Sequence, residues 1–393
     1  MVPSSPVYRP FGALRFLLAL AVVASHTFEM AFADGHLVRR IGIGNIAVMS
    51  FFILSGFIIT EALTTFYANR PFAFMANRLA RIVPPYWAAL TVSVVIHAAL
   101  AWHGPVRMSP TETMPPSAFD AVNLIENALA IFARPSELTF VQDHPFYGFV
   151  RFYWAIYIEL LFYGAVFVVA ALAAIPSVKR RQLGPAIAIA AITGATVLHI
   201  SGEYAGRELL AFPGRWGLTF TPYFLTGVFL YFSLTHWSRA ALIGLAISYG
   251  LMALHFSRYV QHKIPLSDAW AHGLLEPGNA IPILMLLGVP GLLKTLAYTR
   301  AGRIAPIDWR LGSLSYPIYL NHWVVIVALY TLTDEHGYTV QATAIAASIA
   351  LSWLLMHVVE TPMASLRDRL RGRPLWAESS KPAERASADI AVR

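Results

Sequence analysis

Apolar stretches of about 20 residues, separated by short polar segments, recur along almost the whole chain. The hydrocarbon core of a bilayer is roughly 30 Å thick and takes about 20 helical residues to cross. The pattern therefore predicts an all-α polytopic membrane protein with about ten transmembrane helices in one bundle. The predicted spans are residues 11–31, 44–65, 82–101, 148–175, 185–200, 216–235, 240–257, 277–293, 312–332 and 340–359.

The composition agrees with a membrane protein. Of the 393 residues, 57% are hydrophobic and 13% are charged, whereas a soluble domain carries about a quarter charged residues. The chain has no cysteine, which excludes disulfides, thiolate chemistry and cysteine-ligated metal. The first span keeps Arg15 inside its apolar run and lacks a small-x-small cleavage site, so we do not expect a cleavable signal peptide.

Lysine and arginine are distributed unevenly between the two sides of the predicted spans. If the N-terminus is cytoplasmic, nineteen of them lie in cytoplasmic segments and eight in outer loops. Because cytoplasmic loops carry the basic excess, we expect both termini inside, and the net charge of +8 does not indicate a nucleic-acid partner. The expected organisation is a cytoplasmic N-terminus (1–10), a membrane domain (11–362) and a basic cytoplasmic tail (363–393) with a disordered end.

The first span contains two ionisable residues, Arg15 and His26. Eleven helical steps return to within about 20° of the same direction, so both side chains share one face. The rise between them is roughly 16 Å, which places His26 near the middle of the hydrocarbon core. Ionisable groups at that depth are costly and usually functional. The alternative is a snorkelling arginine with a histidine that is hydrogen-bonded within the bundle.

The stretch "ANRLARIVPPYW" precedes the third span. Arg78 and Arg81 are spaced i, i+3 and so share one helical face. Two guanidinium groups in this arrangement can bind phosphate or another anion, although an ordinary positive-inside anchor has the same pattern. Pro84 and Pro85 are expected to start the third helix, which would leave the arginine pair just outside it.

Two later spans each contain an ionisable residue near the middle. Glu159 lies in the fourth span, where pairing with Arg151 is awkward because eight residues give about 12 Å of rise and 80° of rotation. In the ninth span, Ser315, Tyr319 and His322 fall on one stripe at i, i+4 and i+7. We expect His26, Glu159 and His322 to meet around one polar cavity, because each is costly against lipid. A purely structural role for His322 is the alternative.

The second span contains the small residues Ser50, Ser55 and Gly56 among bulky ones. Small residues let the backbones of neighbouring helices approach closely in membranes. We therefore interpret them as packing positions.

Six short motifs occur in a fixed order along residues 11–362, and together they resemble the acyltransferase-3 family of integral membrane acyltransferases. The motifs are R-x10-H (Arg15, His26), FFxLSGF (51–57), RxxR (Arg78, Arg81), W-x4-E-x3-Y (Trp154, Glu159, Tyr163), SYxIYLxH (315–322) and E-x-P (Glu360, Pro362). In many members two acidic residues are adjacent in the fourth-span motif; here Ile158 precedes the single Glu159.

The resemblance implies an O-acyltransferase of the bacterial cytoplasmic membrane. Its donor would be acyl-CoA, usually acetyl-CoA, and its acceptor a sugar hydroxyl on an extracytoplasmic or lipid-linked glycan. No metal is expected, and the chain leaves no room for the fused SGNH-type domain of some members. The acceptor, the acyl chain length, the oligomeric state and an acyl-histidine intermediate stay open.

Residue roles follow from this resemblance and from the charges. The expected catalytic residues are His26, Glu159 and His322, with Glu159 orienting His26 or holding the acceptor. The expected donor-binding residues are Arg15, Arg78 and Arg81. The expected substrate or oxyanion supports are Ser315, Tyr319 and Tyr163, and His322 is expected to stabilise the developing oxyanion together with Tyr319. Two rival classes are a proton-coupled transporter that uses the same buried groups and a non-catalytic scaffold descended from such an enzyme.

Overall fold

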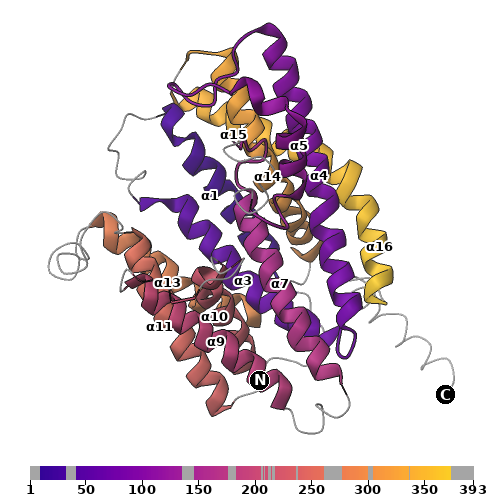
Figure 1. Ribbon diagram of the computed structural model, residues 1–393, viewed down its shortest axis with the longest axis vertical. Helices are drawn as coiled ribbons and strands as arrows, with labels where there is room; N and C mark the ends of the chain where they lie inside the picture. Colours follow the sequence, from indigo (N-terminus) through magenta and orange to yellow (C-terminus); the bar gives the residue numbers. More distant parts are fainter. Residues whose placement is uncertain are drawn as a thin grey trace.

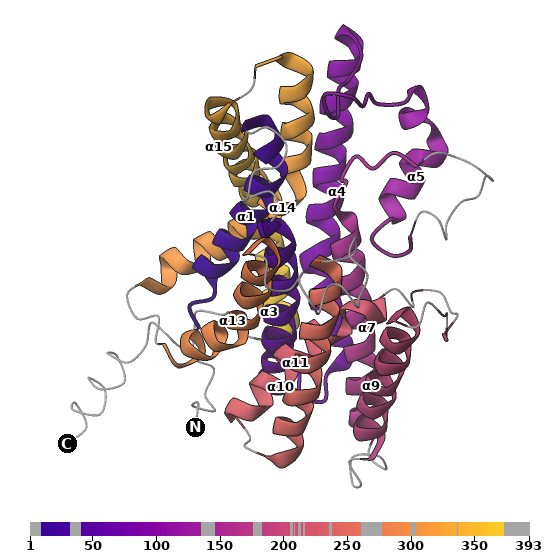
Figure 2. The same ribbon diagram turned by 90° about the vertical axis from the view of Figure 1, so that its left-hand side faces the viewer.

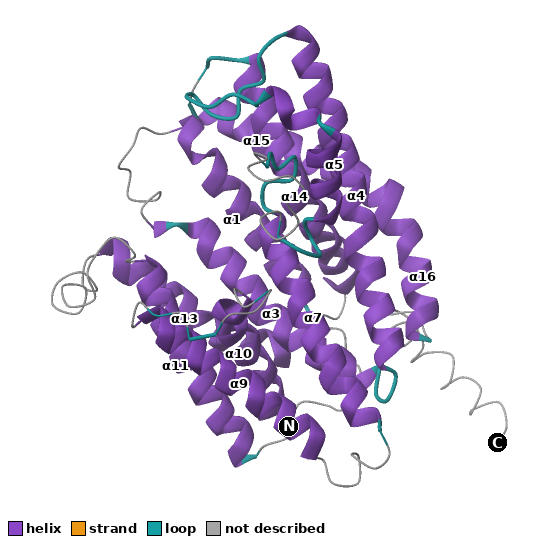
Figure 3. Cartoon of the chain, viewed as in Figure 1, coloured by secondary structure: helices purple, strands orange, loops and turns teal. Residues whose placement is uncertain are grey.

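The computed structural model is an all-α bundle (Figures 1 and 3). The part of the chain that the structure describes forms helices and loops, with one isolated β-bridge and no strand. The expected cytoplasmic N-terminus before residue 9 and the tail after residue 372 lie outside the described residues. The described residues are 9–31, 41–134, 146–175, 183–204, 207, 209–210, 214, 217–235, 238–260, 277–299, 304–335 and 337–372.

A long helix occupies each of the ten predicted apolar stretches within the described residues. These helices are α1 Gly12–Ala31, α3 Ile43–Thr65, α4 Pro71–His103, α7 Tyr153–Ala174, α9 Leu183–Tyr204, α10 Gly217–Thr235, α11 Arg239–Val260, α13 Pro277–Tyr298, α14 Ala305–Leu332 and α15 Tyr338–Leu355. The shorter elements are η1 Pro116–Phe119, α5 Ala121–Leu129, the π-helical turn η4 Met356–Glu360 and α16 Thr361–Arg371.

The helices identify an all-α polytopic membrane protein. Among the described residues, seven helical segments are long and apolar enough to cross a membrane, and the last of them, Tyr338–Arg371, continues from α15 into α16. The exact number of ten spans and the cytoplasmic position of both termini stay predictions. The short helix α5 lies beside α4 at the edge of the bundle (Figure 2).

The start of α4 differs from the prediction. The helix begins at Pro71, eleven residues before the predicted start, and Pro84 and Pro85 lie inside it. Pro71 occupies the first turn, where a missing N–H costs nothing, and membrane helices tolerate interior prolines when a neighbour supports the backbone. Tyr316 of α14 also contacts this part of α4, since its hydroxyl donates a hydrogen bond to the carbonyl of Ile82 (3.1 Å). The arginine pair therefore lies within α4, and the prediction that it lies outside the helix is wrong.

Glycine allows α3 and α10 to touch backbone to backbone. A Cβ atom on Gly56 would lie 2.0 Å from the carbonyl oxygen of Phe224, and one on Gly227 would lie 1.9 Å from that of Ile53. These contacts join α3 to α10, so Gly56 is a packing residue as interpreted from the sequence. Close approach through small residues is the usual way in which membrane helices associate.

The pair α1 and α14 is joined at one end by Asp308. Its carboxylate accepts hydrogen bonds from the backbone N–H groups of Gly12 (2.8 Å) and Ala13 (2.7 Å), the first residues of α1. A carboxylate at a helix N-terminus satisfies open N–H groups and interacts favourably with the helix dipole. A Cβ atom on Gly312 would lie 2.9 Å from the Cα of Gly12, so the backbones are close here too. This contact fixes the height of α1 relative to α14.

Candidate functional site

Seven of the nine predicted site residues line one cavity, with a volume of about 120 Å³. Side chains of α1, α3, α4, α7 and α14 form its wall. Its polar and charged members are Arg15, Ser55, Arg78, Arg81, Glu159, Tyr163, Ser315, Tyr316 and Tyr319, and the rest of the wall is mainly aliphatic and aromatic. We call it the arginine cavity.

Glu159 is hydrogen-bonded inside the arginine cavity. Ser55 Oγ donates to its carboxylate at 2.7 Å, and the hydroxyl of Tyr163, one turn further along α7, donates to the same oxygen. The carboxylate is therefore held by two hydroxyl groups from two helices. The sequence indicated Ser55 only as a packing residue. Its neighbours in the sequence do not show whether its hydroxyl faces a carboxylate on another helix or a helix backbone.

Arg78 is the more deeply buried member of the arginine pair, with 8% of its surface exposed. Its guanidinium carbon lies 5.6 Å from the ring centre of Phe74, one turn earlier in α4. Its Nε atom has no hydrogen-bond partner among the described residues. A buried guanidinium with an unused donor is suited to bind an anionic group that enters the cavity.

The segment η4–α16 packs against the part of α4 that carries the arginine pair. Asn77 Nδ2 donates to the carbonyl of Arg367 (2.8 Å), and Arg367 pairs with Glu360 (3.1 Å). Glu360 of the E-x-P motif thus forms an ion pair with Arg367. This ion pair was not expected from the sequence, because it joins residues whose geometry depends on the π-helical turn between them.

A second cavity, of about 410 Å³, contains His26, and we call it the histidine cavity. Its aromatic lining comes from Phe152, Trp154, Phe220 and Tyr319, and its polar lining from Ser25, His26 and Asn45. Trp154 and Phe220 lie against each other with ring centres 5.6 Å apart. The remaining lining residues are Val22, Gly44 and Val48.

His26 and His322 are brought together beside the histidine cavity. Their ring centres are 5.5 Å apart, with planes inclined by 21°. Phe152 stacks on both rings, with centres 4.0 Å from His26 and 4.9 Å from His322. The sequence did not indicate Phe152 as a site residue. It lies in the turn before α7, where helical periodicity does not predict the direction of a side chain.

The tautomer of His322 follows from its hydrogen bond. Its Nδ1 lies 2.8 Å from the carbonyl oxygen of Tyr319, and since a carbonyl only accepts, Nδ1 carries the proton. The Nε2 atom of the same ring is then a lone-pair acceptor. It is buried and has no hydrogen-bond partner among the described residues. Buried polar atoms are nearly always paired, so this one is a candidate for contact with a substrate or with its neighbour His26.

The three expected catalytic residues thus lie around two cavities and not around one. His26 and His322 are together, whereas Glu159 lies in the arginine cavity. The two cavities share the lining residues Val48 and Tyr319. The three residues divide between two cavities because the relative heights of the helices in the bundle decide which residues meet. The pattern along a single helix does not predict these heights.

Arg151 does not pair with Glu159. Its guanidinium carbon lies 4.7 Å from the ring centre of Trp323, and its charged partner is Glu112, with 3.9 Å between nitrogen and oxygen. Both charged side chains are about half exposed. Within the described ranges, no group of three or more His, Cys, Asp or Glu side chains comes together in a way that can hold a metal ion.

Comparison of the chain with known proteins finds a family match and a similar protein. Residues 11–357 match the family whose description is "Acyltransferase domain". The chain is also similar to the protein described as "Putative membrane-bound transacylase BcsY" of Komagataeibacter xylinus. The two are 24% identical over 321 residues, which cover 81% of this chain and 75% of that protein. No solved structure matches the chain.

Proposed function

The chain belongs to this acyltransferase family, and we propose that it transfers an acyl group from a coenzyme A thioester to a hydroxyl group. The proposed donor is acetyl-CoA from the cytoplasm. The proposed acceptor is a sugar hydroxyl on an extracytoplasmic or lipid-linked glycan. The proposed location is the cytoplasmic membrane of a bacterium. Transfer of an acyl group is also what the name of the similar protein describes.

The observation that carries the proposal is the buried Nε2 of His322, which has no hydrogen-bond partner in the described part of the chain and lies beside a second imidazole. Because Nδ1 donates to the Tyr319 carbonyl, Nε2 is fixed as a base and cannot donate in this tautomer. A base within reach of a hydroxyl is what acyl transfer to an alcohol needs. The stacked pair of His26 and His322 supplies it, with His322 fully buried and His26 facing the histidine cavity.

His26 is the residue that we propose to act on the substrates, because it lines the histidine cavity. In direct transfer, the acceptor oxygen forms a bond to the thioester carbon and the carbon–sulfur bond breaks. The hydroxyl proton passes to the imidazole and from there to the departing thiolate. In the covalent alternative, the imidazole takes the acyl group first and then gives it to the hydroxyl. Both routes yield one ester and one free thiol.

Tyr319 serves a positioning role in this proposal. Its hydroxyl donates to the carbonyl of Phe152 (2.7 Å), so it holds the turn that carries the stacked phenyl ring. An engaged hydroxyl and an imidazole that presents a lone pair are poor donors to an oxyanion. We therefore propose that His322 supports His26 as a second base, in place of the oxyanion role expected from the sequence.

The arginine cavity is the proposed donor site. Coenzyme A is polyanionic, and the cavity gathers Arg15, Arg78 and Arg81 at one place in the bundle. Its mainly apolar wall suits the pantetheine arm, which would carry the thioester toward His26. Since Glu159 lies in this cavity with Ser55 and Tyr163, we place its function on the donor side, next to the arginines.

The histidine cavity is the proposed acceptor site. Aromatic rings offer flat apolar faces to the C–H face of a sugar, and Ser25 and Asn45 offer hydrogen-bonding groups. Its larger volume than that of the arginine cavity also suits a bulky acceptor better than an extended donor arm.

The test is release of free thiol from acetyl-CoA by the purified full chain in lipid nanodiscs. We expect thiol release that rises when a glycan or simple sugar acceptor is added, with acetyl ester found on that acceptor by mass spectrometry. A proton-coupled transporter would release no thiol. Absence of thiol release from every acyl-CoA tested, with and without acceptor, contradicts the proposal.

The proposal also requires that the arginine cavity opens to the side where acyl-CoA is made. Reporter fusions after Arg181 and after Arg373 should both read cytoplasmic, as the lysine and arginine distribution predicts. A fusion after Arg107, in the segment after α4, serves as the control and should read extracytoplasmic. A reversed pattern would place the arginines on the wrong side for the donor.

A further inference from the structure

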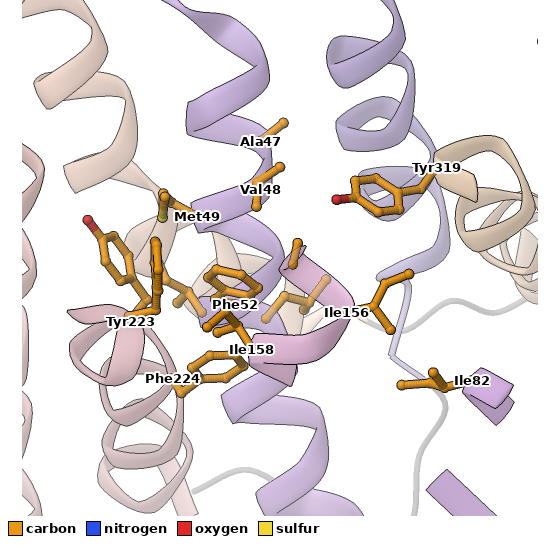
Figure 4. Close-up of a cluster of buried hydrophobic side chains, with 14 of the residues drawn as sticks. Ala47, Val48, Met49, Phe52, Ile82, Ile156, Ile158, Tyr223, Phe224 and Tyr319 are labelled. Carbon is orange, nitrogen blue, oxygen red and sulfur yellow. The ribbon is translucent and has the colours of Figure 1, made fainter. Parts of the chain in front are cut away.

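The wall between the two cavities contains two side chains that line both, Val48 of α3 and Tyr319 of α14. In Figure 4 they lie on facing sides of the space between the two helices, and the tyrosine hydroxyl points toward α3. Phe52, Ile82 and Ile156 line the arginine cavity below them. We call the boundary that Val48 and Tyr319 form between the two cavities the neck.

Both sides of the neck are held in place by the fold. Tyr319 is 9% exposed, and its ring cannot swing away without losing the hydrogen bond from its hydroxyl to the Phe152 carbonyl. Val48 is 6% exposed and belongs to α3, whose backbone touches that of α10 at Gly56. A β-branched side chain on a helix is also restricted to few rotamers. The width of the neck is therefore set by the protein and not by the ligand.

We propose that the neck between Val48 and Tyr319 selects the acyl group by size. The inference rests on the proposed function, in which the donor's phosphates bind the arginines while its carbonyl reacts at His26. Since the arginines line one cavity and His26 lines the other, the acyl end must pass between Val48 and Tyr319 to reach His26. Each extra methylene on the acyl chain must then fit between two side chains that are already fixed.

The physical basis of the selection is steric. Forcing extra methylene groups into a well-packed interior displaces side chains from their rotamers, whereas an enlarged site accepts them. Single methylene differences in an apolar pocket change specificity by about 10- to 200-fold. The neck therefore favours a short acyl group, and removal of the Val48 methyl groups should relax this preference.

The experiment compares thiol release from acetyl-, butyryl- and hexanoyl-CoA by the full chain with one acceptor. Val48→Ala should raise the hexanoyl-to-acetyl ratio of kcat/KM at least about tenfold. Val23→Ala is the matched control, because Val23 is also a buried valine but lines neither cavity. It should keep the wild-type ratio. Val48→Ile, which adds one methylene, should lower the butyryl-to-acetyl ratio and gives a second test if Val48→Ala does not fold.

The outcomes separate the two proposals. If wild type uses acetyl-CoA but Val48→Ala changes all three donors by one common factor, the neck does not select and the inference is overturned. The same holds if Val23→Ala shifts the ratio as strongly as Val48→Ala. If wild type releases thiol from none of the donors, the proposed function itself fails, and the inference fails with it.

Discussion

The two cavities differ in how their polar groups are held. In the arginine cavity, Glu159 is hydrogen-bonded by Ser55 and Tyr163, and the positive charges lie on one face of α4 and at the start of α1. Beside the histidine cavity, the imidazoles of His26 and His322 stack near an aromatic ring, and the buried Nε2 of His322 has no partner among the described residues. The first arrangement suits the binding of an anion, and the second suits the movement of a proton. Substitutions in one cavity or the other should therefore separate donor binding from the transfer step.

The largest expected effect lies in the histidine cavity. His322→Gln removes the imidazole base and should lower turnover at least about 100-fold, which is the low end of general acid–base contributions. Thiol release by purified protein measures this. Asn321→Ala is the control, because Asn321 is an equally buried neighbour on α14 that donates to the carbonyl of Pro317 in its own helix. Equal losses in both variants would indicate a packing effect.

A smaller effect is expected in the arginine cavity. Arg78→Ala should weaken acyl-CoA binding by about 1.5–3 kcal/mol, or roughly 10- to 150-fold, for the loss of one charge-assisted contact. Arg78→Lys should recover only part of this, because a point charge does not replace a planar guanidinium. Isothermal calorimetry with a non-hydrolysable acyl-CoA analogue measures both variants.

Arg107→Ala is the control for this measurement. Arg107 is also a cation, but it pairs with Asp334 in the loop after α14 and lines neither cavity. Its substitution should leave donor binding unchanged. An equal loss of affinity in Arg107→Ala would show that general surface charge, and not the arginine cavity, attracts the donor.

The smallest expected effect tests the hydrogen bond between Ser55 and Glu159. Ser55→Ala should lower kcat/KM for the donor by roughly 2- to 12-fold, which corresponds to about 0.5–1.5 kcal/mol for one hydrogen bond. Tyr163 still holds the carboxylate in this variant, so the loss stays modest. Ser50→Ala removes a serine of the same helix that bonds only the Ile46 carbonyl and should have no effect on kcat/KM. If both serine variants behave alike, Ser55 is a packing residue.

The helices and their apolar faces could be predicted because burial in a bilayer requires long apolar segments. The exception was α4, where Pro84 and Pro85 indicated a helix start. The sequence does not report which parts of the bundle pack against that turn, such as Tyr316, more than two hundred residues away, which donates to the Ile82 carbonyl. Packing of this kind in a helix bundle can override local proline preference.

The candidate site could be predicted residue by residue, but its division could not. Helical periodicity grouped Ser315 with Tyr319, which both line the arginine cavity, but it also grouped Arg15 with His26, which line different cavities. Which of them meet across helices depends on their relative heights, which contacts such as that of Asp308 with the start of α1 fix. Phe152 escaped prediction because its position depends on a turn and on the hydrogen bond that its carbonyl accepts from Tyr319.

The most direct test of the central claim is a paired measurement on His26→Gln. The account predicts near-normal affinity for an acyl-CoA analogue by calorimetry together with at least about a 100-fold lower rate of thiol release. His97→Gln is the matched control, since His97 is buried on α4, bonds the carbonyl of Ser93 and lines neither cavity. It should retain both properties. A folded His26→Gln protein with near-wild-type turnover would contradict the account and make the buried histidine structural.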